Sequence, residues 1–202
     1  MSTIKDPIVW MDCEMTGLNV EQDSLIEVSV LITDSELNIV DTKGLDVVIK
    51  ADKPAAVENM DDIVTAMHTK SGLINEIKDG LDLDDAQKEV LSYIKKYISE
   101  PGIALLAGNS VGMDKAFLQK YMPEVIAYLH YRILDVSTIK ELTRRWYPDV
   151  YNNAPEKAEG HRALADIFES IQELKFYRNT IFVPEPGPSV ATLQEINKKY
   201  SQ

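Results

Sequence analysis

Apolar residues near the start of the chain follow a period of two, which is typical of β-strands. Residues 25–33 (LIEVSVLIT) form a β-branched run and predict a strand. Residues 8–11 (IVWM) begin another apolar strand, and residues 45–49 (LDVVI) predict an antiparallel neighbour of the 25–33 strand. The residues that share one face of the 25–33 strand are Ile26, Val28, Val30 and Ile32.

Beyond residues 45–49 the apolar period becomes that of α-helices. The first clear pattern, which runs through Ala86 and Ile98, ends at Pro101-Gly102, and a buried strand is expected over 103–107. Further helices are predicted between Gly112 and Pro123, over 136–146 and over 162–178. The residues expected to face inward are Phe117, Leu118, Tyr121 and Met122 in the first of these, Val136, Ile139, Leu142 and Trp146 in the second, and Leu164, Ile167, Phe168, Ile171 and Leu174 in the third.

The order of these elements predicts the fold class. Strands come first and alternating strands and helices follow, which is typical of an α/β domain with a mixed sheet. At 202 residues the chain fits one domain, which we expect to span residues 1–182. Residues 183–189 (VPEPGPS) predict a stiff, non-helical linker, so residues 183–202 are expected to be a Pro-rich linker and a short tail.

Composition narrows the classes of function. Charged residues make up 27% of the chain, and no apolar run approaches the roughly 20 residues that a membrane helix needs. The N-terminus lacks the pattern of a secretory signal, and the single cysteine, Cys13, suits a reducing compartment. Cytoplasm is therefore the default expectation, and a processed organellar form stays open. The net charge of −12 disfavours a basic groove for long nucleic acids, so a nucleic-acid substrate is expected to be short and to depend on metal ions.

Two carboxylates lie near the exit of the first strand. Because side chains alternate along a strand, Asp12 and Glu14 point to the same face. Neighbouring carboxylates repel each other unless a cation lies between them, and ligand sets made of oxygen alone suit Mg²⁺ or Mn²⁺. The motif therefore favours metal-dependent phosphoryl chemistry.

Two further acids are expected in helices. Asp114 falls in the first turn of the helix that follows the 103–107 strand, where an acid is often only a cap. His161 and Asp166 are too far apart to share one helix face, so we expect His161 on a loop or at the helix entry and Asp166 one turn inside. From there the histidine can approach a metal site, although a lone histidine is more often an ordinary surface residue.

Five segments together resemble the DEDDh 3′→5′ exonucleases, and in particular the oligoribonucleases, which have a ribonuclease-H-like fold. The segments are WMDCEMTGL at 10–18, HTKSGL at 68–73, GNSVGMDKAFLQKYMP at 108–123, HYRILDVSTIKEL at 130–142 and HRALAD at 161–166. The resemblance extends over residues 8–182, nearly the whole predicted domain. It implies a mixed five-stranded sheet flanked by helices.

The resemblance also implies a two-metal-ion mechanism. Two divalent ions, Mg²⁺ or Mn²⁺, would lie about 4 Å apart, with Asp12 bridging both. Glu14 and Asp166 would complete the first metal site, and Asp114 would hold the second ion. His161 would act as the general base on the attacking water. The product would be a 5′-mononucleotide released from the 3′ end.

Substrate length is implied by a further set of residues. Leu18 would wedge between the two terminal bases, although without the family it reads as an ordinary apolar loop residue. Tyr131 would come from a partner subunit, which implies a homodimer. Ser137 and Thr138 are equally good helix caps. The other residues expected to contact the oligonucleotide, chiefly at its 5′ phosphate, are His68, Ser110, Arg132, Ser137 and Thr138.

One position departs from the family pattern. Oligoribonucleases usually have a tryptophan shortly before the His68 motif, and the matching residue here is Ile63. Stacking of a base on an aromatic ring contributes about 1–3 kcal/mol, so its loss predicts weaker binding of that base. Cys13 faces away from Asp12 and Glu14 and is expected to fill the core.

Three functions are compatible with this pattern. We predict an exoribonuclease that degrades RNA of two to a few nucleotides. The alternative is a DEDDh exonuclease acting on longer single-stranded RNA or DNA, which the acidic charge and the expected phosphate-binding residues disfavour. A non-catalytic binding protein on the same fold would tolerate loss of ligands, yet all five catalytic positions are present.

Overall fold

A five-stranded sheet lies at the centre of the computed structural model, which describes residues 4–156 and 162–201. Its order is β3-β2-β1-β4-β5. β2 pairs antiparallel with β1 and β3, whereas β4 pairs parallel with β1 and β5, so the sheet is mixed as predicted. The strands are β1 (Ile8–Met15), β2 (Leu25–Thr33), β3 (Leu45–Val48), β4 (Leu105–Gly108) and β5 (Ile133–Asp135).

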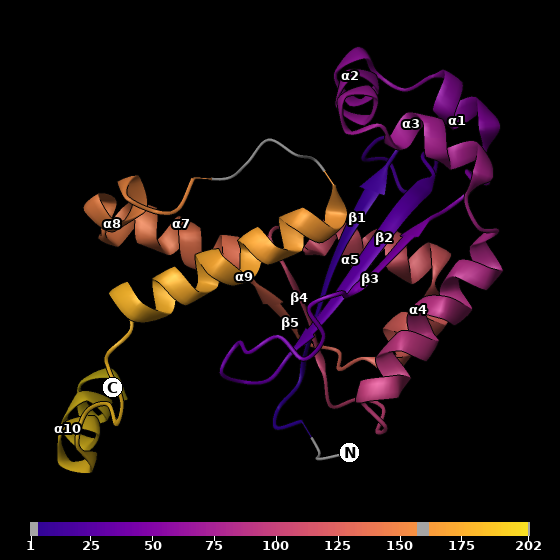
Figure 1. Cartoon of the computed structure of the whole chain (residues 1–202). Helices are drawn as coiled ribbons and strands as arrows, with labels where there is room; N and C mark the ends of the chain where they lie inside the picture. Colours follow the sequence, from indigo (N-terminus) through magenta and orange to yellow (C-terminus); the bar gives the residue numbers. More distant parts are fainter. Residues whose placement is uncertain (1–3, 157–161, 202) are drawn as a thin grey trace.

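Helices cover both faces of this sheet (Figure 1). The described helices are α1 (Pro54–Glu58), α2 (Asp62–Ser71), α3 (Leu73–Glu76), the 3₁₀-helix η1 (Ile77–Asp79), α4 (Leu83–Tyr97), α5 (Gly112–Tyr121), α6 (Pro123–Tyr128), α7 (Val136–Trp146), α8 (Pro148–Asn152), α9 (Ala163–Thr180) and α10 (Val190–Tyr200). The long helix α9 crosses one face and contacts four strands, while α4 and α5 contact the strands from the other side. The short helices α1 to α3 lie near the end of the sheet at which β1 finishes.

The two faces of the sheet bury separate apolar clusters. Met11, an odd-numbered residue of β1, packs in one cluster with Val90 of α4 and Phe117 of α5. Trp10, an even-numbered residue, packs in the other with Ile167 of α9. Because both faces are covered, every residue of β2 is buried. Cys13 belongs to the α4–α5 cluster, as expected.

The structure corrects two expectations. Trp146, expected to face inward, is 66% exposed. It is the last residue of α7, which runs outward from the edge strand β5, so no strand lies beneath that end of the helix (Figure 1). The strand expected over 103–107 begins instead at Leu105, where parallel pairing with Ile8 of β1 starts, and Ile103 before it is exposed.

The C-terminal residues form an additional helix. Residues 183–189 contain no helix or strand, and α10 follows them with its N-cap Ser189 accepting a hydrogen bond from the Thr192 N–H. Figure 1 shows α10 apart from the sheet and its covering helices. Within the described ranges, no helix combines the length and the apolar character needed to cross a membrane.

Candidate active site

Three carboxylates meet where the end of β1 lies against the start of α9. Asp12 and Glu14 are even-numbered residues of β1, so they leave the strand on the side that α9 covers. Asp166, in the first turn of α9, completes the group, and one oxygen of each carboxylate lies within 4.8 Å of the others. We call these three residues the acidic cluster.

Asp114 reaches the same region from the opposite layer. It lies in the first turn of α5, and its Oδ1 accepts a hydrogen bond of 3.0 Å from the N–H of Cys13, between the two acids of β1. Burial raises the pKa of Asp114 to about 6, although hydrogen bonds to its carboxylate act in the opposite direction. Among the described residues, Asp114 is thus beside the acidic cluster and outside its group of three.

The surroundings of Glu14 favour binding of a cation. Its side chain is buried, and this burial together with the charge of Glu27 raises its pKa to about 8. The charges of Asp166 and Asp114 act in the same direction. Close carboxylates ionise together only when a cation compensates them, and a donor set made of oxygen alone is the kind that Mg²⁺ and Mn²⁺ prefer. The residues present therefore fit a divalent metal site.

The start of α9 is held against the sheet by Glu27 and Arg162. Glu27 lies opposite Glu14 in the β1–β2 register and is fully buried. Its Oε2 accepts a hydrogen bond of 3.2 Å from the Ala163 N–H, and its Oε1 lies 2.9 Å from Nη2 of Arg162. These contacts set the place of the first turn of α9, which carries Asp166.

The two histidines expected at the site differ. His161 lies outside the described residues. His68, in α2, is fully buried, and its Nε2–H donates a hydrogen bond of 2.9 Å to the carbonyl oxygen of Met15. Its Nδ1 lies 3.9 Å from Oε2 of Glu14. The structure therefore places His68 at the end of β1, beside Glu14 of the acidic cluster.

Ser110 and Ser137 come together from separate elements. Ser110 follows β4, Ser137 lies in the first turn of α7, and their hydroxyl oxygens are 3.1 Å apart. Oδ1 of Asp135 accepts the backbone N–H of Ser110 at 3.0 Å and that of Ser137 at 2.9 Å. These bonds hold Ser110 at a φ of 54°, which is uncommon for residues other than glycine. Thr138, the next residue of α7, is exposed beside the pair.

Tyr131 and Arg132 lie on the surface before β5. The ring of Tyr131 is 73% exposed and stacks on that of His130 at a centroid distance of 4.5 Å. Nε–H of Arg132 donates a hydrogen bond of 3.1 Å to the hydroxyl oxygen of Tyr131. Tyr131 and Arg132 thus form an exposed pair just before β5.

Leu18 is an exposed residue on an anchored loop between β1 and β2. The carbonyl oxygen of Asp23 accepts hydrogen bonds from the Tyr121 hydroxyl at 2.5 Å and from Nζ of Lys53 at 3.3 Å. The Asp23 carboxylate in turn accepts the Asn19 N–H at 2.8 Å. Leu18 is therefore presented to solvent from a fixed turn.

Sequence reasoning missed several residues that shape the site. Glu27 had a signal, since it is the only charged residue in the run 25–33. Asn109, whose side chain hydrogen-bonds to Ser137 and Ser170, had no such signal, because an asparagine after a strand is an ordinary turn residue. Arg162 belongs to the 161–166 motif, but its pairing with Glu27 and Glu76 depends on the tertiary structure.

The chain is similar in sequence to known exonucleases. The family model described as exonuclease (RNase_T) matches residues 9–174. An oligoribonuclease of Streptomyces avermitilis is 53% identical over 197 residues, which cover 98% of each chain. An oligoribonuclease of Leifsonia xyli is 54% identical over 194 residues, covering 96% of this chain and 93% of that one.

Solved structures of exonuclease I share the fold. One superposes with a TM-score of 0.64 at 14% identity, covering 87% of this chain and 41% of that one. The E. coli exonuclease I complex with single-stranded DNA gives a TM-score of 0.65 at 14% identity and covers 88% of this chain. This chain thus spans about 41% of the length of those proteins, and at this identity the likeness concerns the fold alone.

Proposed function

The chain belongs to the oligoribonuclease family of exonucleases, and on this premise we propose that it is a 3′→5′ exoribonuclease that hydrolyses RNA of two to a few nucleotides to 5′-mononucleotides. The observation that carries the proposal is the acidic cluster, in which oxygens of Asp12, Glu14 and Asp166 lie within 4.8 Å of one another. Four acids converge on one end of the sheet from β1, α5 and α9, which a structural role alone does not require.

The acids are assigned to two divalent ions, Mg²⁺ or Mn²⁺. Asp12, Glu14 and Asp166 would hold one ion, and Asp12 and Asp114 would hold the other. When bound, such a pair of ions supplies an activated water and compensates the charge that develops on the leaving oxygen. The raised pKa of Glu14 supports the assignment, because burial and the neighbouring carboxylates make its ionised form unfavourable unless a cation compensates it.

His161 is assigned as the general base that takes a proton from the attacking water. The ordinary pKa of histidine lies near neutrality, which suits this role. For His68, which is buried beside Glu14, we propose support of the end of β1 in place of direct contact with the oligonucleotide.

The residues assigned to substrate binding would contact both the bases and the 5′ phosphate of a dinucleotide. Leu18 wedges between the bases from its anchored loop. Tyr131 completes the site from the second subunit of a homodimer, which is supported by its exposed ring. The residues assigned to the 5′ phosphate are Ser110, Arg132, Ser137 and Thr138.

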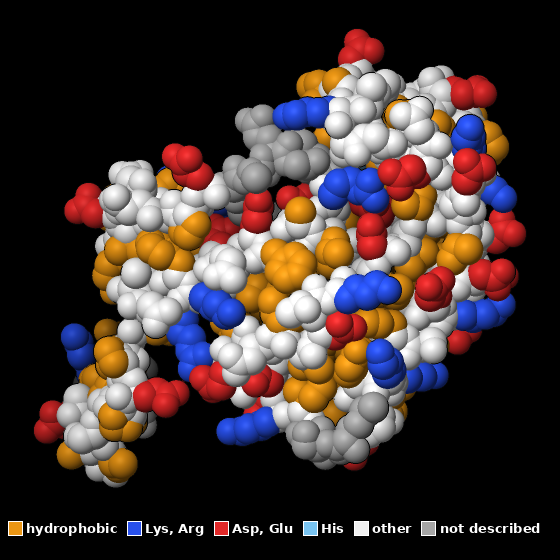
Figure 2. Space-filling model, in the orientation of Figure 1, with side chains coloured by type: hydrophobic (Ala, Val, Ile, Leu, Met, Phe, Trp, Pro, Cys, Tyr) orange, Lys and Arg blue, Asp and Glu red, His pale blue; other side chains and the backbone are white. Residues whose placement is uncertain are grey.

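Longer single-stranded RNA or DNA is the alternative substrate. On the face shown in Figure 2, Lys and Arg side chains alternate with Asp and Glu, and no continuous basic stripe crosses the described atoms of that face. The net charge of −12 points the same way, since a long strand requires a groove that compensates many phosphates. We therefore favour the short substrate.

Two assignments concern the chain as a whole. We propose that residues 1–182 form the catalytic domain and that α10 serves another purpose, because Figure 1 shows α10 apart from the elements that carry the site. We also place the enzyme in the cytoplasm, where its single cysteine, the buried Cys13, stays reduced.

The test is hydrolysis of 5′-labelled RNAs of two, three, seven and about twenty nucleotides, with Mg²⁺ and with EDTA. We expect cleavage that needs metal and strongly favours the dinucleotide. Metal-dependent cleavage that is indifferent to length would move the protein to the general exonucleases. Absence of cleavage at every length would refute the proposal.

A further inference from the structure

Asn109 lies between the two parts of the proposed site, which are the serine pair Ser110 and Ser137 and the helix that carries Asp166 of the acidic cluster. It directly follows β4, and its amide reaches both α7 and α9. Its Oδ1 accepts a hydrogen bond of 3.1 Å from the Ser137 hydroxyl. Its Nδ2 donates to Oγ of Ser170 at 2.8 Å and to Oε2 of Glu173 at 3.1 Å. The Asn109 side chain thus joins α7, which carries Ser137, to α9, which carries Asp166.

The hydrogen bonds around Asn109 have a single consistent direction. Ser170 donates its one hydroxyl hydrogen to the carbonyl oxygen of Asp166 at 2.9 Å, so its own oxygen accepts from Asn109. Ser137 donates its hydroxyl hydrogen to Asn109, so Ser110 is the donor in the contact between the two serines. This pattern orients the amide, with Oδ1 toward α7 and Nδ2 toward α9.

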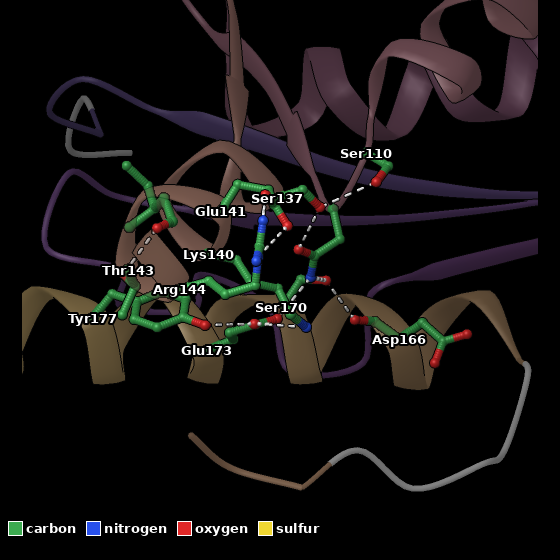
Figure 3. A network of polar contacts seen from close by, with 12 residues as sticks. Ser110, Ser137, Lys140, Glu141, Thr143, Arg144, Asp166, Ser170, Glu173 and Tyr177 are labelled. Carbon is green, nitrogen blue, oxygen red and sulfur yellow. Dashed lines mark hydrogen bonds and ion pairs between the residues drawn. The ribbon is translucent and has the colours of Figure 1, made fainter. Parts of the chain in front are cut away.

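Glu173 is a hydrogen-bond acceptor that fixes the orientation of the Asn109 amide. Its side chain is nearly fully buried, and Oε1 accepts a hydrogen bond of 3.0 Å from the Tyr177 hydroxyl and lies 3.3 Å from Nζ of Lys140. Figure 3 shows Ser170 and Glu173 projecting from the same helix as Asp166, with Ser137 above them. A buried carboxylate with partners on both oxygens is costly to displace, so it is a rigid acceptor for the amide.

The backbone and the hydroxyl groups of the two serines are fixed by different residues. Asp135 holds the backbone N–H of Ser110 and of Ser137. Asn109 makes no bond to these N–H groups and acts on the hydroxyl of Ser137. Its removal should therefore reorient the hydroxyl groups while leaving the chain path around them in place.

We propose that Asn109, oriented by Ser170 and Glu173, is a positioning residue that holds the Ser137 hydroxyl beside Ser110 at a fixed place relative to the acidic cluster. The Ser110 hydroxyl can then turn its hydrogen from Ser137 to the 5′ phosphate, which sets the preference for a 5′-phosphorylated dinucleotide. The inference rests on the proposed function, in which these serines bind the 5′ phosphate. A dinucleotide must engage the serines and the cluster at once. A longer RNA carries its 5′ phosphate elsewhere, so the same misalignment affects it less.

Asn109→Ala is the first variant, and Asn179→Ala is its matched control. The second change removes an amide on α9 whose Nδ2 donates to the Lys175 carbonyl, away from this network. The quantity measured is kcat/KM with Mg²⁺ for a 5′-phosphorylated RNA dinucleotide, for the same dinucleotide without that phosphate, and for a seven-nucleotide RNA. We expect Asn109→Ala to lower the first value about tenfold, as for the loss of one or two hydrogen bonds, and the other two less than about twofold. The control should leave all three unchanged.

Two substitutions of Glu173 keep the test decisive if Asn109→Ala does not fold. Glu173→Gln retains one oxygen, which accepts from Asn109 when the amide NH2 is turned toward the Tyr177 hydroxyl oxygen, whereas Glu173→Leu retains none. We expect the glutamine variant to keep the preference for the phosphorylated dinucleotide and the leucine variant to lose it, with the Mg²⁺ concentration for half-maximal activity unchanged in both. Thermal unfolding of each variant reports any general loss of structure.

The outcomes separate the inference from the proposed function. A parallel loss on all three substrates would make Asn109 a purely structural residue and overturn the inference, as would an unchanged preference in Asn109→Ala and Glu173→Leu. In either case the proposed function stands, because the unaltered protein still prefers the dinucleotide. An unaltered protein without that preference would refute both.

Discussion

Glu14 and Glu27 lie directly opposite each other on β1 and β2, and both side chains are buried. Burial is the main cause that raises the pKa of Glu14 to about 8 and that of Glu27 to about 7, and the charge of Glu27 adds to the effect on Glu14. Near neutral pH the folded protein therefore retains protons that an unfolded chain has already released.

We predict that the metal-free protein loses stability as the pH rises from about 4.5 to about 8. A folded-state pKa above the unfolded value means that the folded state binds more protons in this window. The stabilising contribution is complete below the unfolded pKa and is lost as the pH passes the folded pKa. Thermal unfolding in EDTA across this range measures the loss. Glu27→Gln, which keeps an acceptor for the Ala163 N–H, should show a shallower decline.

Added Mn²⁺ or Mg²⁺ should raise Tm more at pH 8 than at pH 6. Metal binding needs ionised carboxylates, and the raised pKa of Glu14 makes that ionisation incomplete at the lower pH. Unfolding at both pH values, with and without metal, provides the comparison. Equal shifts at the two pH values would contradict a metal site that includes Glu14.

Asp12→Asn should lower kcat at least about a hundredfold. Changes to residues that only support a metal ligand lower activity by up to about a hundredfold, and loss of a ligand itself should lower it by no less. The substitution keeps the shape of the side chain and removes the charge that the proposed two-metal assignment gives to both ions. Asp149→Asn, on the exposed helix α8, is the control for loss of one negative charge and should retain activity. Circular dichroism should be unchanged in both variants. Substantial activity in Asp12→Asn would refute the two-metal assignment.

Ile63→Trp should tighten binding of a dinucleotide. Ile63 is 79% exposed on α2, so a larger ring meets no steric barrier there, and stacking on a base contributes about 1–3 kcal/mol. We expect KM for the dinucleotide to fall by at least about fivefold. Thr65→Trp, at an exposed position on the same helix, controls for a tryptophan that points elsewhere. A similar gain in both variants would show non-specific stacking.

Mixing two inactive variants tests the partner role of Tyr131. A mixed dimer of Asp12→Asn and Tyr131→Ala subunits contains one site with an intact Asp12 and an intact Tyr131 only if the tyrosine acts across the interface. Random exchange of subunits should then restore about a quarter of the sites. Activity of the mixture for the dinucleotide, against each variant alone, decides the point. No recovery in a mixture shown by sedimentation to contain dimers would place Tyr131 in its own subunit.

Local pattern predicted the strands β1 to β4 and the helices α4, α5, α7 and α9, whereas it gave no separate signal for β5 or for the helices α6, α8 and α10. The strand expected over 25–33 agrees with β2, and Cys13 lies in the α4–α5 cluster as strand alternation predicted. The pattern also put Asp12 and Glu14 on one face, and the structure shows Asp166 meeting them there. Alternation along a strand and the period of a helix are properties of neighbouring backbone units, so a single sequence contains them.

The α/β class, the strand that carries two acids and the helix that carries the third were thus predictable from local pattern. Which distant side chains meet depends on how the elements pack: Glu27 lies opposite Glu14, and Asn109 lies between Ser137 and Glu173. This packing also decides that Trp146, apolar and in phase with its helix, stays outside. The physical reason is that periodicity orients a side chain relative to its own element, whereas strand order and the layer above decide what that side chain contacts.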